Sequence, residues 1–327
     1  MKLLLELSME CESLSRSEVV AAADALGGRT KVVVEEPGVM VIDTMADPAA
    51  LADRLGLCHY VSEWLCSCEE GELRDRASEF DVQGPIRVRS TKVGDVKVDL
   101  AAATRLVGDV LGKSRGVDLH HPRSDIRVVF SGNAHVGRLV GAIDRASFEK
   151  RKNRYMPYFY PASLHPKFAR ALVNLTRTGR GARLLDPFCG TGAILAEASL
   201  VGLEAIGTDL SEKMISGARK NLDHIGAKAM LAVSDVGGIA ERTGRVDGIA
   251  TDPPYGKSTS TNGEGIPALY KRAFQAFSKI LSQGSYLAIV VPRTSLLDDA
   301  DDFEVLEIHS LWVHRSLTRH FCVLKKS

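Results

Sequence analysis

The sequence predicts an α/β protein with a doubly wound, mainly parallel sheet in its C-terminal half and a smaller α+β region before it. Two patterns lead to this prediction. From residue 183 onward, short apolar runs alternate with amphipathic helical segments, the rhythm of a parallel sheet covered on both faces. Before that point, strand and helix signals alternate less regularly. The length of 327 residues allows about two domains.

The first 45 residues predict a small α+β unit. Residues 3–7 form an apolar run typical of a strand. Ser15 or Ser17 is placed to cap a helix that ends at Gly27-Gly28. Two β-branched runs, 31–34 and 39–43, flank Glu-Pro-Gly and predict a hairpin.

A second α+β unit is predicted to follow. One of its helices is expected to close at Gly112. The expected helices are 48–55, 73–80 and 98–111, and the expected strands are 61–68, 86–89, 126–131 and 135–143.

The C-terminal half predicts a seven-stranded sheet whose last strand is antiparallel. Ser211 is placed to cap one of its helices. The expected strands are 184–186, 205–209, 229–234, 246–252, 286–291, 305–313 and 319–325, and the expected helices are 193–201, 211–225 and 268–281. The last two strands form an antiparallel hairpin at the sheet edge.

Composition limits the class of protein. The 42 Lys and Arg nearly balance 41 Asp and Glu, which excludes a uniformly basic coat protein. The balance conceals a basic stretch, residues 145–183, with ten Lys or Arg and one acid, Glu149. The six Cys lack paired zinc spacing, so we expect no metal. We also expect no signal peptide, no membrane span and a cytoplasmic location.

A glycine turn joins the first parallel strand to its helix at Asp186-Pro187-Phe188-Cys189-Gly190-Thr191-Gly192. The dinucleotide fingerprint requires a third glycine, and Leu195 occupies that position. Gly256-Lys257-Ser258 resembles the end of a P-loop, but Thr251 occupies the position of its first glycine. Both of those motifs are therefore rejected.

Acidic residues stand at the ends of the first three parallel strands. Asp209 is placed to accept from ribose hydroxyls, Asp235 from an adenine amino group, and Asp186 from the amino end of a methionine moiety. Together they suit S-adenosylmethionine, whereas each Asp alone would be an ordinary strand-end residue. The further expected contacts are Phe188, Cys189, Gly190, Thr191, Gly192, Leu210 and Val236.

The sequence Asp252-Pro253-Pro254-Tyr255 follows the fourth parallel strand. The Asp252 carboxylate and the Pro253 carbonyl can accept hydrogen bonds from a nucleobase amino group, which frees its lone pair for methyl transfer. Prolines fix the backbone around that carbonyl. Tyr255 offers a face on which an extruded base can stack. We therefore predict that these four residues are catalytic.

With these two motifs, residues 155–327 resemble class I S-adenosylmethionine-dependent amino methyltransferases, a Rossmann-like fold. A further family motif, which contacts the methionine moiety, resembles Tyr160-Pro161-Ala162-Ser163-Leu164-His165-Pro166. The resemblance therefore adds Tyr160 and Leu164 to the expected cofactor contacts.

The N-terminal half narrows this resemblance. Val117-Asp118-Leu119, Pro122, Ile126-Arg127-Val128 and Gly137 resemble a THUMP domain, an RNA-binding module. Residues 144–151, 164–171 and the tail 313–319 resemble the archaeal tRNA (guanine-N2-)-methyltransferases of guanosine 10. The resemblance implies a ferredoxin-like region (1–48), a THUMP domain (49–144), a basic linker (145–175) and a methyltransferase domain (176–327).

The resemblance also implies a tRNA substrate and N2-methyl- or N2,N2-dimethylguanosine as product. We expect no obligatory protein partner. The expected RNA contacts are Lys113, Arg115, Arg123, Arg145, Lys150, Arg151, Lys152 and Arg154. Two alternatives stay open: an amino methyltransferase acting on another tRNA position, rRNA or DNA, and a non-catalytic RNA-binding module.

Overall fold

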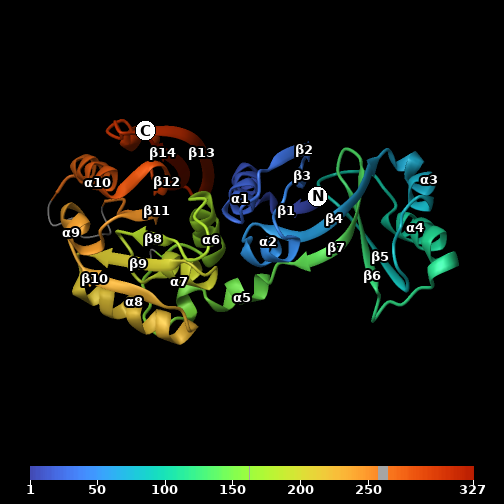
Figure 1. The fold of residues 1–327 in the computed structure, drawn as a ribbon, viewed down its shortest axis with the longest axis horizontal. Coiled ribbons are helices and arrows are strands. Elements are labelled where there is room, and N and C mark those ends of the chain that lie inside the picture. The colour runs from blue at the N-terminus through green and yellow to red at the C-terminus, as the bar shows by residue number, and fades with distance from the viewer. Residues whose placement is uncertain (162, 257–263) are drawn as a thin grey trace. The chain divides into compact units, whose positions relative to one another are not determined.

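The computed structural model describes residues 1–161, 163–256 and 264–327. The chain forms two compact units, each built on a seven-stranded sheet (Figure 1). The first unit comprises residues 1–16, 27–53 and 58–143, and the second comprises residues 17–26, 54–57 and 144–327. Lys257 and Ser258 of the rejected P-loop lie outside the described residues.

The sheet of the first unit is mainly antiparallel, in the order β2-β3-β1-β4-β7-β6-β5, and only its β5–β6 pair is parallel among the described strands. Its strands are β1 (Lys2–Leu7), β2 (Lys31–Glu36), β3 (Val39–Asp43), β4 (Cys58–Cys68), β5 (Ile86–Lys92), β6 (Ser124–Phe130) and β7 (Ala134–Ala142). The predicted 31–34 and 39–43 hairpin is the β2–β3 pair.

Helices α3 (Leu73–Ser78) and α4 (Leu100–Arg115) pack on β4 to β7 of this sheet, and α2 spans Pro48–Arg54. Their apolar side chains share one core with Ile86, Val128 and Val136. Among the sheet residues, buried Arg127 forms an ion pair with Glu6 and stacks on the Tyr60 ring. Because both charges are paired, this polar pair is tolerated in the interior.

Two predicted helix boundaries in the N-terminal half of the chain are wrong. Ser8 caps a short 3-10 turn, η1 (Met9–Cys11), which leads directly into α1 (Glu12–Ala25), so Ser15 and Ser17 lie inside the helix. The hydroxyl of Ser15 donates to the Cys11 carbonyl instead. Helix α4 runs through Gly112 and ends at Arg115, and Gly116 follows as its C-cap with a φ of 74°, which suits a glycine.

The second unit has the predicted mainly parallel sheet, in the order β10-β9-β8-β11-β12-β14-β13. Strand β14 runs antiparallel to both of its neighbours, β12 and β13, so the predicted antiparallel last strand is confirmed. The strands are β8 (Arg183–Asp186), β9 (Glu204–Asp209), β10 (Ala229–Val233), β11 (Val246–Thr251), β12 (Leu281–Val291), β13 (Phe303–His314) and β14 (Leu317–Lys326).

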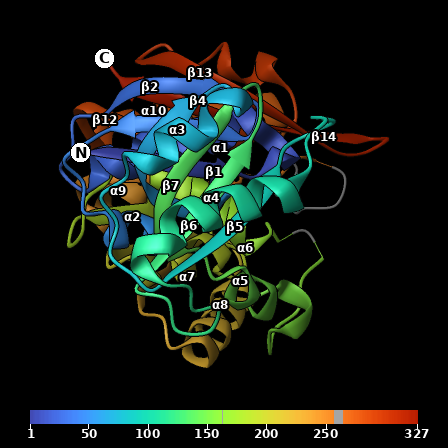
Figure 2. The ribbon, with the colours of Figure 1, turned by 90° about the vertical axis from the view of Figure 1, so that its right-hand side faces the viewer.

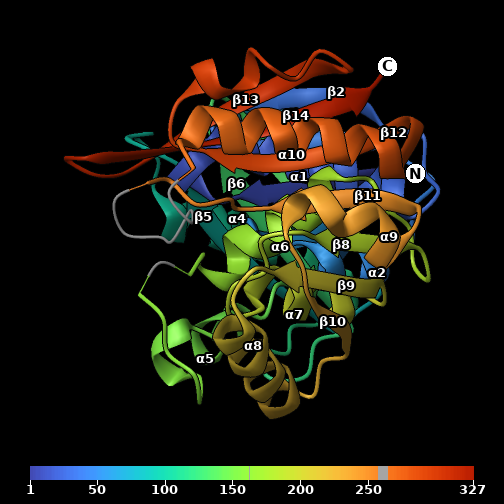
Figure 3. The same cartoon turned by 90° about the vertical axis from the view of Figure 1, so that its left-hand side faces the viewer.

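Helices cover both faces of this sheet (Figure 3). On one face lie α6 (Pro166–Leu175), α7 (Ala193–Leu200) and α8 (Glu212–Ile225), where Phe168 of α6 packs on Phe321 of β14. On the other face, α9 (Ile239–Thr243) and α10 (Ile266–Ile280) share a core with β11 and β12. Strand order reverses between β8 and β11, and ligands of open α/β sheets bind at such a point.

The predicted basic linker contains two helices, α5 (Arg145–Lys150) and the buried α6. Helix α6 begins at Pro166 with His165 as its N-cap and shows the strong amphipathic pattern of a core helix. Within the described ranges, no helix has the length and apolar character needed to cross a bilayer.

Candidate active site

The glycine turn lies between β8 and α7, as predicted. Asp186 is the last residue of β8, and Gly192 is the N-cap of α7. Gly190 and Gly192 have φ angles of 49° and 85°, the left-handed region that favours glycine. No side chain crowds the position where a Cβ of Gly190 would lie, so the backbone is open to a ligand there.

Asp186 is a buried carboxylate at the centre of this turn. Its Oδ1 accepts a hydrogen bond from the Thr251 hydroxyl at 2.7 Å and from the Phe188 amide at 3.2 Å. Burial raises the pKa of Asp186 to about 7, and the nearby charges of Asp252 and Asp209 act in the same direction. A bound cation would stabilise its ionised form.

Asp209 ends β9 beside the glycine turn. Its Oδ2 accepts from the Gly190 amide at 3.0 Å, and its Oδ1 accepts from the Ser211 amide at 2.8 Å. Each carboxylate oxygen has a second lone-pair direction, so both can still accept from hydroxyl groups. Burial raises the pKa of Asp209, and the two amides oppose that shift.

Asp235 lies just after β10 and forms an ion pair that the sequence did not predict. Its Oδ1 accepts from the Arg272 guanidinium and from the Gly237 amide. Arg272, on α10, also donates to Glu264, with its nearest nitrogen 2.6 Å from Oε2. Partial burial acts to raise the pKa of Asp235, but the hydrogen bonds from Arg272 and the backbone amides, together with the charge of Arg272, outweigh it and the pKa is lowered.

The Asp252–Tyr255 sequence follows β11, as predicted. The Tyr255 hydroxyl donates to Oδ1 of Asp252. Burial raises the pKa of Asp252 to about 6, while the positive charge of Arg319 and the Tyr255 hydrogen bond lower it. The Tyr270 hydroxyl is buried and close enough to Asp252 to feel its charge. No described group forms a hydrogen bond with this hydroxyl.

The three strand-end carboxylates, the residues 186–191 of the glycine turn and Asp252–Tyr255 line one pocket of about 770 Å³ at the carboxyl edge of the sheet. A cofactor-sized ligand fits this volume. The pocket contains every predicted catalytic residue and every predicted cofactor residue except Gly192, which caps α7 instead. The lining residues that the sequence did not single out as contacts are Ser163, Pro187, Ala193, Ile194, Ser211, Met214, Ser234, Glu264, Leu269 and Arg272.

The predicted methionine-contacting motif also reaches the pocket. Tyr160, Ser163 and Leu164 line it, and the Ser163 hydroxyl lies 2.7 Å from the Thr191 hydroxyl of the glycine turn. Ala162 of this motif lies outside the described residues. Ser163 could have been found from the sequence, because it stands inside the motif. Arg272 gave no signal, because a cation on an amphipathic helix predicts a solvated face.

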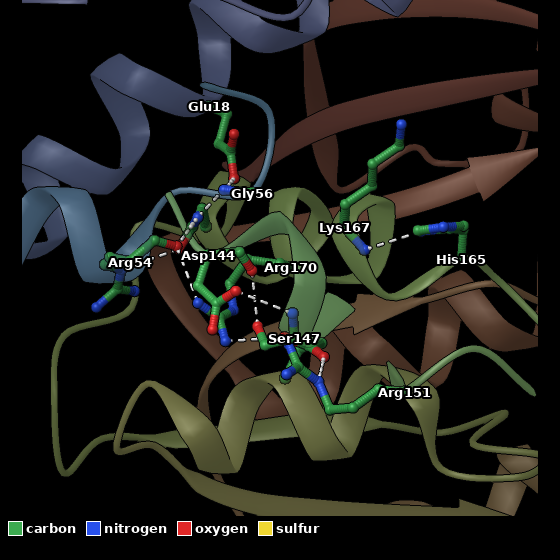
Figure 4. Close-up of polar contacts among 11 residues, drawn as sticks. Glu18, Arg54, Gly56, Asp144, Ser147, Arg151, His165, Lys167 and Arg170 are labelled. Carbon is green, nitrogen blue, oxygen red and sulfur yellow. Dashed lines mark hydrogen bonds and ion pairs between the residues drawn. The ribbon is translucent and has the colours of Figure 1, made fainter. Parts of the chain in front are cut away.

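A buried polar network holds α6, the helix that follows this motif (Figure 4). Glu18 accepts from the amides of Gly56 and Leu57 at 2.8 and 2.7 Å. Asn174 of α6 donates to Glu18 at 2.9 Å and accepts from Arg54 at 2.9 Å. Burial raises the pKa of Glu18 to about 7, opposed by these hydrogen bonds.

The residues predicted to contact RNA differ in whether their side chains are exposed or bonded within the protein. Lys113, Arg123, Arg145, Lys150 and Arg154 are exposed, and Lys152 is half-buried beside Glu149. Arg115 instead donates to the carbonyls of Phe80 and Val82 within the first unit. Arg151 is paired with Glu197 at 2.7 Å, and Arg170 is paired with the same carboxylate at 2.8 Å. Arg115 and Arg151 thus each have partners within the protein, and RNA contact by either residue stays a prediction.

Among the described residues, no cluster of three or more His, Cys, Asp or Glu is arranged to hold a metal ion.

The donor set fits S-adenosylmethionine. Asp186, Asp209 and Asp235 place carboxylates along one pocket, which matches a ligand with an ammonium group, ribose hydroxyls and an amino-substituted ring. A family model described as an RMKL-like methyltransferase domain matches residues 153–320. The second unit is therefore a class I, S-adenosylmethionine-dependent methyltransferase domain.

Two curated relatives extend the match to the rest of the chain. The tRNA (guanine(10)-N2)-dimethyltransferase of Methanothermobacter thermautotrophicus is 33% identical and is matched over 100% of both chains. The enzyme of the same name from Pyrococcus abyssi is 32% identical over 95% of this chain and 96% of its own. The chain belongs to the tRNA (guanine(10)-N2)-dimethyltransferase family.

A solved structure shares the fold over the whole length. The crystal structure of TrmN from Thermus thermophilus has a TM-score of 0.57 and 24% identity and covers 100% of both chains. At this identity the likeness supports the fold alone.

Proposed function

We propose that this chain methylates the exocyclic N2 of guanosine 10 in tRNA and adds a second methyl to give N2,N2-dimethylguanosine. The observation that carries this proposal is the position of Asp252–Tyr255 in the same pocket as three strand-end carboxylates. Membership of the family supports tRNA as the substrate and position 10 as the methylated guanosine.

The cofactor supplies a methyl group on a sulfonium, an electrophile. In the proposal, Asp186 binds its ammonium group, Asp209 accepts from the ribose hydroxyls and Asp235 accepts from the adenine amino group. The glycine turn and Tyr160, Ser163 and Leu164 enclose the methionine part. Arg272 and Gly237 occupy Oδ1 of Asp235, so Oδ2 is the oxygen presented to the adenine amino group.

Asp252 and Pro253 hold the target amino group. Tyr255 donates to Oδ1 of Asp252, which leaves Oδ2 to accept from the N2 amino group of guanine. With the cofactor bound, this nitrogen would take the methyl group from the sulfonium, which would leave as a neutral thioether, and the proton of the nitrogen would pass to Oδ2 of Asp252. Fixed acceptors at this position stabilise the positive charge that develops on the nitrogen.

The first unit and the exposed cations bind the tRNA in this proposal. The proposal includes four domains with the limits 1–48, 49–144, 145–175 and 176–327. It also includes RNA contacts by the exposed residues of the predicted set, which are Lys113, Arg123, Arg145, Lys150 and Arg154. We further propose that the chain acts without a protein partner and in the cytoplasm.

The proposal is tested by methylating tRNA transcripts with the purified chain and labelled S-adenosylmethionine, followed by mass mapping of the modified nucleoside. A matched transcript carries inosine at position 10, which lacks only the 2-amino group of guanosine. We expect one or two methyl groups at position 10 and none on the inosine transcript. Methyl groups at another tRNA position, or in rRNA or DNA offered in parallel, would support the alternative amino methyltransferase instead.

A further inference from the structure

The turn of the β13–β14 hairpin lies at the edge of the sheet where the pocket opens. Strand β14 is antiparallel to β12, and their pairing ends with Val291 opposite His320. The residues before His320 therefore extend beyond the carboxyl end of β12, the edge at which the pocket opens. Figures 2 and 3 show the hairpin extending past the neighbouring strands. At its base, the charge of Arg319 acts on both Asp252 and Tyr255.

The tip of the hairpin, residues 312–316, exposes a large aromatic side chain. Trp312 is 70% exposed, although indole is among the side chains that gain most from burial. It pairs in register with Thr318, while Leu311 pairs with Arg319, so Trp312 lies on the sheet face opposite Leu311. His314, Arg315 and Ser316 around it are also exposed.

The tip also carries a positive charge, at Arg315, and no acidic side chain. The sequence contains no Asp or Glu after Glu307. Around the turn, Arg315 and Arg319 are cationic, and His314 and His320 are their neighbours in sequence. An exposed ring among cations is the pattern of single-stranded nucleic-acid binding, where a base stacks on the ring and a phosphate pairs with the cation. Such a small tip offers far less than the roughly 800 Å² per partner of a stable protein interface.

We propose that the hairpin tip is an RNA-binding element, in which Trp312 stacks on a base flanking the methylated guanosine and Arg315 pairs with a neighbouring phosphate. This inference rests on the proposed function, since it takes tRNA as the substrate. A guanosine rotated into the pocket leaves its neighbours without a stacking partner. The indole replaces that partner, at the edge where the base enters.

The first test measures tRNA binding by variants of the tip. Trp312→Ala should weaken tRNA binding about 5- to 100-fold, the loss typical of one stacked base. Trp312→Phe should retain most of the affinity. Arg315→Gln should reduce the slope of log affinity against log salt by about one. Met230→Ala is the matched control, because Met230 is 50% exposed on β10, the opposite edge strand.

Unchanged affinity for S-adenosylmethionine in each variant would show that the second unit is folded. Equal tRNA affinity of Trp312→Ala and Met230→Ala would overturn the proposal.

The second test uses fluorescence, since the chain has only two Trp residues. Trp64, in the first unit, is half-buried and donates to Ser67. In the Trp64→Phe variant, tRNA should change the emission of Trp312 and protect it from acrylamide. Protection that grows with protein concentration without RNA would show a second copy on the tip and contradict the inference.

Failure of this inference differs from failure of the proposed function. A chain that binds tRNA through Trp312 but methylates no guanine N2 would refute the function alone. A chain that methylates guanosine 10 with a tip insensitive to tRNA would refute the hairpin contact alone.

Discussion

The hydroxyl of Tyr255 donates a hydrogen bond to Oδ1 of Asp252, three residues before it. The bond fixes the carboxylate in the pocket and places the aromatic ring beside it. In the proposed function, Tyr255 therefore both orients the acceptor of the target amino group and offers a stacking surface for its base.

Tyr255→Phe separates these two roles. The variant keeps the ring but loses the hydrogen bond, so we expect a roughly 10- to 100-fold lower rate of methyl transfer, the value of one hydrogen bond to a charged group. Affinity for S-adenosylmethionine should be unchanged in calorimetry. Tyr255→Ala, which removes the ring as well, should be slower still, and equal rates for the two variants would refute a stacking role.

The rate of methyl transfer should depend on the ionisation of Asp252. Burial raises its pKa to about 6, and only the carboxylate form can accept hydrogen bonds with both oxygens. We therefore expect the single-turnover rate to fall as pH decreases below about 6. Arg319→Gln should move this midpoint to higher pH, because Arg319 favours the charged form. A midpoint that is identical in both proteins would show that Arg319 does not act on Asp252.

Arg272 should influence cofactor affinity through Asp235. It binds Oδ1 of that carboxylate, and in the proposed function Oδ2 accepts from the adenine amino group. Arg272→Gln should weaken binding of S-adenosylhomocysteine by about 3- to 10-fold, a modest loss for one oriented hydrogen bond. The analogue with hypoxanthine in place of adenine lacks the amino group, so its affinity should change much less. Equal losses for both ligands in calorimetry would contradict this role.

Glu18 should make the stability of the chain depend on pH. Its pKa is about 7 in the folded state and about 4.5 in the unfolded state, so only the folded state binds this proton between those values. The free energy of unfolding should therefore fall as pH rises from about 4.5 to 7, by on the order of 1–3 kcal/mol. Glu18→Gln should flatten this dependence in denaturant titrations at pH 5 and 7.5. An equally steep fall in the variant would assign the effect to other groups.

Much of the second unit could be predicted from its sequence because its signals are local. Apolar runs ending in Asp186, Asp209 and Asp235 place three carboxylates at one sheet edge once the strands are parallel. The Ser211 cap was likewise predicted, and the structure confirms its bond to the Met214 amide.

The remaining features depend on contacts between distant segments. Asn174 binds Glu18 across 156 positions of sequence, and Arg151 pairs with Glu197 across 46. A charged side chain on a helix predicts a solvated face, and only the folded chain shows its buried partner. For this reason the sequence did not indicate the Arg151–Glu197 pair or the buried position of Glu18.

The most direct test of the account compares Asp252→Ala with the unaltered chain in single-turnover methylation of a guanosine-10 tRNA. We expect transfer to N2 to fall by at least about 100-fold, while the affinities for tRNA and S-adenosylmethionine stay within about two-fold. Asp252→Asn, which keeps the shape, should retain part of the rate through its carbonyl oxygen. Transfer at the full rate by Asp252→Ala would contradict the assignment of this carboxylate as the acceptor of the target amino group.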